Sequence, residues 1–92
     1  MDLLTEDEIT AQLASLPGWA RTGDSIAATF SRADFRDSLL FVGAVAYLAE
    51  AANHHPDVAI AWNKVTLTLW THTAGGLTAA DFALAGQISS LP

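Results

Sequence analysis

The fold is decided by the stretch VAIAWNKVTLTL, residues 58–69, in which apolar residues alternate with small or polar ones on both sides of Asn63-Lys64. Such alternation is typical of a half-buried strand. A two-residue turn at Asn63-Lys64 therefore predicts an antiparallel hairpin in which Trp62 faces Val65 and Val58 faces Leu69. On that register one face of the sheet is apolar, as a half-buried sheet requires. The apolar face comprises Val58, Ile60, Trp62, Val65, Leu67 and Leu69.

Upstream of this hairpin, the chain predicts a short helix and then a first hairpin. Thr5 and Glu8 have the spacing of a capping box, and Pro17-Gly18 ends the helix that follows. Apolar residues recur between them at helical spacing, namely Ile9, Leu13 and Leu16. Strands over residues 19–21 and 26–30 flank the sequence Thr-Gly-Asp-Ser, which is typical of a turn.

A longer helix is expected from about Asp34 to about Ala52, with either Ser31 or Asp34 as its N-cap. Its expected buried stripe comprises Phe35, Leu39, Val42, Ala46 and Ala49. The helix must end before Pro56, because the residue that precedes a proline avoids the helical conformation.

A third helix is expected after the Gly75-Gly76 break. Thr78 and Asp81 are spaced as an N-terminal capping pair, and Leu77 and Phe82 are placed as a hydrophobic staple. The buried stripe of this helix comprises Leu84, Ile88 and Leu91. The predicted order is α-β-β-α-β-β-α over a single domain, residues 1–92. That order predicts an α+β fold, with three helices packed on one face of a four-stranded antiparallel sheet.

Length and composition exclude several classes of function. Ninety-two residues allow one domain, and a net charge of −6 argues against nucleic acid or an anionic membrane as the main partner. The absence of cysteine excludes disulfides, thiol nucleophiles and thiolate metal sites. The acidic N-terminus does not resemble a signal peptide, and the longest apolar run, residues 39–49, is too short to span a bilayer. We therefore expect a cytoplasmic protein.

All three histidines, His54, His55 and His72, belong to one region of the predicted fold. Extended past Pro56, the hairpin register places His55 opposite His72 on the polar face of the sheet. A single histidine at a helix end is most simply explained by the helix dipole, which favours its charged form. Three histidines that converge from two elements favour a site, because an imidazole both donates and accepts protons near neutral pH.

Two other kinds of chemistry are weighed against proton transfer. A three-histidine zinc centre is a known catalytic arrangement, but the neighbouring side chains of His54 and His55 point in different directions and no HExxH motif is present. No serine lies in a nucleophile-elbow motif, and no cysteine is available. We therefore expect no metal and no cofactor, and acid–base chemistry on a small molecule.

The motif formed by these residues resembles the signature of the pterin-4a-carbinolamine dehydratases: Glu50-x3-His54-His55-Pro56-x5-Trp62-x9-His72-x8-Asp81. Residues 16–19, 63–67 and 71–78 resemble further blocks of that family. The resemblance implies that water is eliminated from a 4a-hydroxytetrahydrobiopterin-like substrate to give the quinonoid dihydropterin. It also implies that this reaction recycles the pterin used by aromatic amino acid hydroxylases.

The resemblance also implies roles for the site residues. His54 and His72 become the candidate acids that protonate the departing hydroxyl, and His55 becomes a pterin-binding residue that takes part in base catalysis. Glu50 precedes His54 by one helical turn, so it either orients that ring or is a solvated charge. Asp81 is expected to cap the third helix, with a second role near His72. Trp62 is a substrate-binding candidate, although its position favours packing in the core.

Two residues depart from the family pattern, and two alternative functions remain open. Thr73 stands where an acidic residue is usual, and Trp70 stands where small hydroxyl residues are common, so Trp70 either narrows the pocket or fills a subunit contact. The alternatives are a catalytically silent binding or assembly module, and dehydration of a different carbinolamine. Open sheet edges and a small domain favour a homodimer or homotetramer, as the resemblance also implies.

Overall fold

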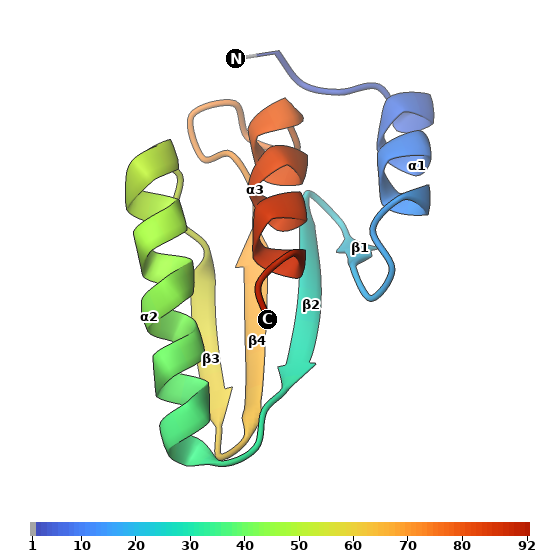
Figure 1. Ribbon diagram of the computed structural model, residues 1–92. Coiled ribbons are helices and arrows are strands. Elements are labelled where there is room, and N and C mark those ends of the chain that lie inside the picture. The colour runs from blue at the N-terminus through green and yellow to red at the C-terminus, as the bar shows by residue number, and fades with distance from the viewer. Residues whose placement is uncertain (1) are drawn as a thin grey trace.

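The structure is a computed structural model that describes residues 2–92; Met1, the first residue of the predicted domain, lies outside the described residues. The elements are α1 (Glu6–Ala14), β1 (Ala20–Thr22), β2 (Ser25–Ser31), α2 (Phe35–Ala52), β3 (Asp57–Ala61), β4 (Lys64–Leu69) and α3 (Ala79–Ser89). The four strands form one antiparallel sheet in the order β1-β2-β4-β3. The helices α2 and α3 lie over one face of this sheet, and α1 lies beside β1 (Figure 1). The predicted α+β order is confirmed.

Local capping explains where the helices begin. The amide of Glu8 donates to the Thr5 hydroxyl over 3.2 Å, and the amide of Thr5 donates to the Glu8 carboxylate over 2.8 Å. This is the predicted capping box. The start of α2 is decided in favour of Asp34, whose carboxylate accepts the amide of Asp37 over 2.7 Å. The capping box at the start of α3, between Thr78 and Asp81, is also present.

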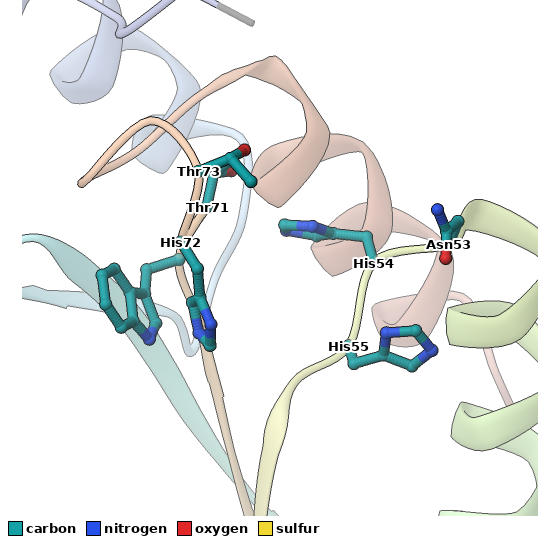
Figure 2. Close-up of a pocket in the computed structure, with 7 residues that line it drawn as sticks. Asn53, His54, His55, Thr71, His72 and Thr73 are labelled. Carbon is teal, nitrogen blue, oxygen red and sulfur yellow. The ribbon is translucent and has the colours of Figure 1, made fainter.

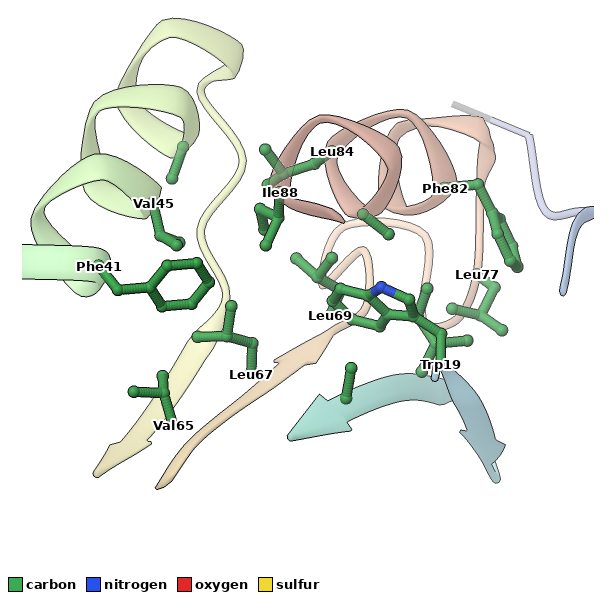
Figure 3. Packing of buried hydrophobic residues seen from close by; sticks show 14 of the residues in the cluster. Trp19, Phe41, Val45, Val65, Leu67, Leu69, Leu77, Phe82, Leu84 and Ile88 are labelled. Carbon is green, nitrogen blue, oxygen red and sulfur yellow. The ribbon is translucent and has the colours of Figure 1, made fainter. Parts of the chain in front are cut away.

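The core lies between the sheet and the helices α2 and α3. The buried side chains of β4 alternate as predicted; Val65 and Leu67 lie near Phe41 of α2, and Leu69 lies toward α3 (Figure 3). The fully buried side chains of β4 and α3 are Val65, Leu67, Leu69, Ala85 and Ile88, and Leu84 is nearly fully buried. The indole N–H of Trp19 donates to the Ser89 hydroxyl over 2.7 Å, which ties the start of β1 to the end of α3.

The predicted buried stripe of α2 is right for Ala49, which is buried, and for Val42, which packs partly buried against the core, but it is wrong for Phe35, Leu39 and Ala46. The buried side chains of this helix are Ser38, Phe41, Val45 and Ala49. Of the predicted stripe, Phe35 is 52 % and Leu39 48 % exposed. Apolar residues occur almost all round α2, so helical spacing alone does not single out one face. Even so, no helix within residues 2–92 has both the length and the apolar character needed to cross a bilayer.

The predicted register of the second hairpin is also wrong, by two residues. Val58 pairs with Leu67 and Ile60 with Val65, so the turn is made by Trp62 and Asn63. A shift of two residues leaves each strand residue on its predicted face. The exception is Trp62, which leaves the sheet, has a φ of +53° and is 69 % exposed.

Contacts from distant residues hold this unexpected turn. The Ser38 hydroxyl donates to the Trp62 carbonyl oxygen over 2.8 Å, and the Arg32 amide donates to the Asn63 carbonyl oxygen over 2.7 Å. The side-chain amide of Asn63 donates back to the Arg32 carbonyl oxygen. These bonds fix the turn against the start of α2, and they cannot be read from the hairpin sequence alone.

Candidate active site

The three candidate histidines line one cavity of about 330 Å³, between the end of α2 and the segment that follows β4 (Figure 2). The corrected hairpin register does not place His55 opposite His72, because β3 begins only at Asp57. The residues meet instead because both segments emerge at the same end of the β3–β4 hairpin. The cavity is lined by Asn53, His54, His55, Trp70, Thr71, His72 and Thr73.

The end of α2 directs the two neighbouring histidines to different sides. Asn53 adopts the left-handed conformation with a φ of +50°, and the His54 amide donates to the Ala49 carbonyl oxygen over 3.0 Å. This left-handed ending turns the chain out of the helix. His54 then points toward the segment that carries His72, whereas His55 points toward α2 (Figure 2).

His54 binds a buried carboxylate. Its Nε2 lies 2.6 Å from Oδ1 of Asp81, a side chain that is 0 % exposed. The other oxygen of Asp81 accepts the Thr71 hydroxyl over 2.8 Å and the Thr78 amide over 2.9 Å. Because an ionised carboxylate only accepts hydrogen bonds, Nε2 of His54 carries a hydrogen and Nδ1 is its other exchangeable position. A carboxylate that fixes a histidine tautomer in this way prepares the ring for proton transfer.

Asp81 therefore has the predicted capping role and a different partner from the one expected. Its expected neighbour was His72, and its partner is His54. Of the two threonines that contact Asp81, Thr78 is the predicted capping partner, whereas the contact with Thr71 was not predicted. The capping box is a signal for Thr78, whereas no pattern in the sequence singles out Thr71.

His55 pairs with Glu50 through its Nε2, and both side chains are largely exposed to solvent. Of the two alternatives for Glu50, the pairing with His54 is wrong, whereas a solvated charge agrees with its exposed side chain. That pairing needs the helix to continue for one more turn, but α2 ends at Ala52 and the left-handed Asn53 turns His54 away. The site thus contains two imidazole–carboxylate pairs, one buried and one exposed.

His72 is the third imidazole and stacks on an aromatic side chain. Its ring centroid lies 4.1 Å from that of Trp70, with 41° between the planes. Trp70 forms part of the cavity wall, which agrees with the expectation that it narrows the pocket. The turn that carries His72 is closed by the Thr71 amide, which donates to the Gly76 carbonyl oxygen over 2.9 Å. A Cβ at Gly76 would lie 3.0 Å from a methyl group of Leu3, so the Leu3 side chain would have to shift to admit one.

Trp62 does not line the cavity, whereas Glu50 and Asp81 contact histidines that do. It lies in the turn between β3 and β4, at the end of the hairpin opposite the histidines (Figure 1). Its expected packing in the core is wrong, since most of its surface is exposed.

The histidines do not converge on a common point. In the part of the chain that the structure describes, no group of three His, Asp or Glu side chains is arranged to hold a metal ion. What the cavity offers chemically is three imidazoles, two of them held by carboxylates, around a space that fits a small organic molecule.

The structure is thus a small α+β domain with a histidine-lined cavity at one end of its sheet. The sequence matches the family described as Pterin 4 alpha carbinolamine dehydratase over residues 2–91, and the chain belongs to that family. A protein of Roseiflexus castenholzii named "Putative pterin-4-alpha-carbinolamine dehydratase" is 53 % identical over 89 residues, which cover 97 % of this chain and 96 % of that one.

Two solved structures are similar to this fold. The crystal structure of a transcriptional coactivator/pterin dehydratase from Brucella melitensis has a TM-score of 0.92 and 33 % identity, with 97 % of both chains covered. A pterin dehydratase-like protein identified as a RuBisCO assembly factor in the alpha-carboxysome has a TM-score of 0.64 and 22 % identity, with 78 % of this chain and 83 % of that one covered. At that identity the second likeness concerns the fold alone.

Proposed function

We propose that this protein eliminates water from a 4a-hydroxytetrahydropterin to give the quinonoid dihydropterin. The observation that carries this proposal is the meeting of His54, His55 and His72 at one cavity in a chain of this family. In cells that use a pterin for aromatic hydroxylation, the reaction would return the spent pterin toward its tetrahydrobiopterin-like form.

The substrate supplies the electrons for this reaction. The lone pair on pterin N5 forms a double bond to C4a as the C4a–O bond breaks. The leaving hydroxyl takes a proton and departs as water, and the proton on N5 passes to a base. Because one proton is given and one is taken, no oxidant or reductant is required. General acid–base groups that assist such steps contribute roughly 10²–10⁴-fold in rate.

The arrangement of the side chains supports a division of these roles. His54 points toward the segment after β4 that carries His72, and these two histidines are proposed as acids for the leaving hydroxyl. His55, paired with Glu50, is proposed to bind the pterin and take part in removing the N5 proton. Trp70 offers an aromatic face at the cavity wall.

Turnover of freshly generated 4a-hydroxytetrahydropterin, followed by absorbance, tests the proposal. The purified protein should accelerate dehydration well above the spontaneous rate, and the double variant His54→Ala/His72→Ala should not. Prolonged chelation followed by desalting should leave the rate unchanged, because the proposed chemistry uses only the substrate and the histidines. A well-folded protein without turnover would instead favour a catalytically silent binding or assembly module, or a different carbinolamine.

We further propose that the protein is a homodimer or homotetramer. On α2, Leu40 is 67 % and Tyr47 76 % exposed, and their spacing of seven residues places them on one face of the helix. The strand β3 forms an edge of the sheet, and exposed edges invite pairing. A second copy of the chain would cover an apolar surface that a 92-residue domain gains from burying.

A further inference from the structure

Thr71 is a buried residue to which the proposed chemistry gives no role. It comes directly before His72 and is 7 % exposed. Its hydroxyl lies 2.8 Å from Oδ2 of Asp81 and 2.8 Å from the hydroxyl of Thr78. The side chain of Thr71 therefore contacts the carboxylate that holds His54, and any effect on the imidazole passes through that carboxylate.

The hydrogen bonds around Asp81 follow from the number of donors. An ionised carboxylate accepts only, so the Thr71 hydroxyl and the Thr78 amide donate to Oδ2 while His54 donates to Oδ1. The one hydrogen of the Thr71 hydroxyl is thereby used, which leaves the Thr78 hydroxyl to donate to the Thr71 oxygen. Donors on both oxygens fix the plane of a carboxylate that has no contact with solvent.

The backbone of Thr71 holds the second candidate acid. Its carbonyl oxygen accepts the amides of Ala74, Gly75 and Gly76 at 3.1, 2.9 and 3.3 Å. Its own amide donates to the Gly76 carbonyl oxygen over 2.9 Å. These four bonds close the turn on which His72 stands. The side chain of Thr71 thus contacts the carboxylate that holds His54. Its backbone shapes the turn that contains His72.

We propose that Thr71 is a positioning residue that joins the two candidate acids, with its hydroxyl fixing Asp81 on Nε2 of His54 and its backbone fixing the turn of His72. This inference rests on the proposed function. With Nε2–H directed at Asp81, Nδ1 of His54 is the atom that exchanges protons with the substrate. The hydroxyl also shares the negative charge of the carboxylate, so its removal should leave more of that charge facing His54.

Replacing the hydroxyl by a methyl group tests the side-chain role in the full-length protein. Thr71→Val should lower kcat about tenfold with little change in KM, since the carboxylate that holds His54 loses a charge-assisted hydrogen bond. Thr71→Ser keeps the hydroxyl and should recover most of kcat. The matched control is Thr66→Val, which removes one member of the exposed Thr29–Thr66 hydroxyl pair, 2.9 Å apart, on the sheet face without helices. Its kcat should equal that of the unmodified protein.

A second readout does not depend on turnover. The ¹⁵N shifts of the His54 ring, followed against pH, report which nitrogen carries the proton and where the ring titrates. The unmodified protein should show the neutral ring protonated at Nε2, and Thr71→Val should raise the titration midpoint by about 0.5–1 pH unit. The titratable groups around His54 are Asp81 on α3, His72 after β4, Glu50 near the end of α2, and His55, which follows that helix. The shift should therefore persist when His72→Ala and Glu50→Gln are added.

The outcomes separate positioning from simple packing. If Thr71→Val unfolds earlier but keeps its kcat and its His54 titration, or if Thr71→Ser is as impaired as Thr71→Val, the positioning role is overturned. If Thr71→Val does not fold, Thr71→Ala removes the hydroxyl without placing a methyl group against Asp81, and the same criteria apply to it. If the unmodified protein does not dehydrate the pterin, the proposed function fails, and the His54 titration still decides what Thr71 does to the His54–Asp81 pair.

Discussion

His72 is the candidate acid whose loss should cost rate and not stability. It is exposed and its ring contacts Trp70 at the cavity wall. We predict that His72→Ala lowers turnover by about 10²-fold or more, because a proton donor to the leaving hydroxyl is lost. The free energy of unfolding should change by no more than about 0.5 kcal/mol, as is usual for exposed positions. Rate and urea unfolding are measured on the same sample.

The companion variant is His54→Ala. If both histidines act as acids, each single variant keeps some activity that the double variant lacks. Histidine variants that melt early and turn over normally would show that the rings serve packing.

Replacing Asp81 should cost stability as well as rate, because its carboxylate caps α3 and holds His54. We predict that Asp81→Asn lowers the free energy of unfolding by about 1–3 kcal/mol, since an amide in place of the carboxylate cannot accept from the same three donors without leaving a buried group unpaired. The upper part of this range exceeds the roughly 1 kcal/mol that is expected when a helix cap alone is lost. Chemical denaturation measures the change.

The control for Asp81→Asn is Glu50→Gln, which alters the exposed carboxylate of the other pair. Its stability should stay within about 0.5 kcal/mol of the unmodified protein, because the side chain is solvated. Its turnover should fall, because His55 loses the carboxylate that orients it. Equal stability losses in the two variants would contradict the assignment of a buried and an exposed pair.

At the scale of elements, the start of α2 carries a pH-dependent contribution to stability. The amide of Ala33, at 2.9 Å, and then the guanidinium of Arg32 hold the pKa of Asp37 below its usual range. A carboxyl whose pKa is lower in the folded state stabilises the fold above its unfolded pKa, about 3.9, and loses that contribution as the pH falls through the folded value.

We therefore predict that the stability of the unmodified protein falls more steeply below about pH 4 than that of Asp37→Asn. Urea midpoints measured at a series of pH values test this. Asp2→Asn, at an exposed position, is the control and should keep the steep fall. Parallel curves for the unmodified protein and Asp37→Asn would show that this carboxylate contributes nothing to acid sensitivity.

The elements that the sequence predicts well are those set by local chemistry. The capping boxes at Thr5 and Thr78 and the alternation of β4 involve residues a few positions apart, so the printed sequence contains their cause. The buried face of α2 and the register of the second hairpin depend on distant contacts, such as that of the Ser38 hydroxyl with the Trp62 carbonyl oxygen. No spacing rule within either element contains that contact.

The site shows the same division. The meeting of the three histidines was predictable, because the two segments that carry them lie at the ends of neighbouring strands. Their partners were not predictable, because the left-handed Asn53 turns the chain so that His54 pairs with Asp81 and His55 with Glu50. A single backbone conformation at a helix end thus decides which imidazole is buried.

At the scale of the whole molecule, the cavity and the proposed assembly surface lie on different parts of α2. The cavity is reached from the C-terminal end of the helix, and Leu40 and Tyr47 lie on its outward face. A substitution on that face can therefore change assembly while leaving the histidines and their carboxylates in place, which makes the proposal of a homo-oligomer testable by itself.

We predict that light scattering at micromolar concentration gives two or four times the 9.7 kDa mass of one chain. The double variant Leu40→Glu/Tyr47→Glu should shift that mass toward the monomer, because two carboxylates would have to lose their hydration inside an apolar contact. Ala11→Glu, at an exposed position of α1, is the matched control and should leave the assembly intact. A monomer mass for the unmodified protein would contradict the assembly proposal, whereas a double variant that stays assembled would move the contact from α2 to another surface, with the edge strand β3 as the next to be substituted.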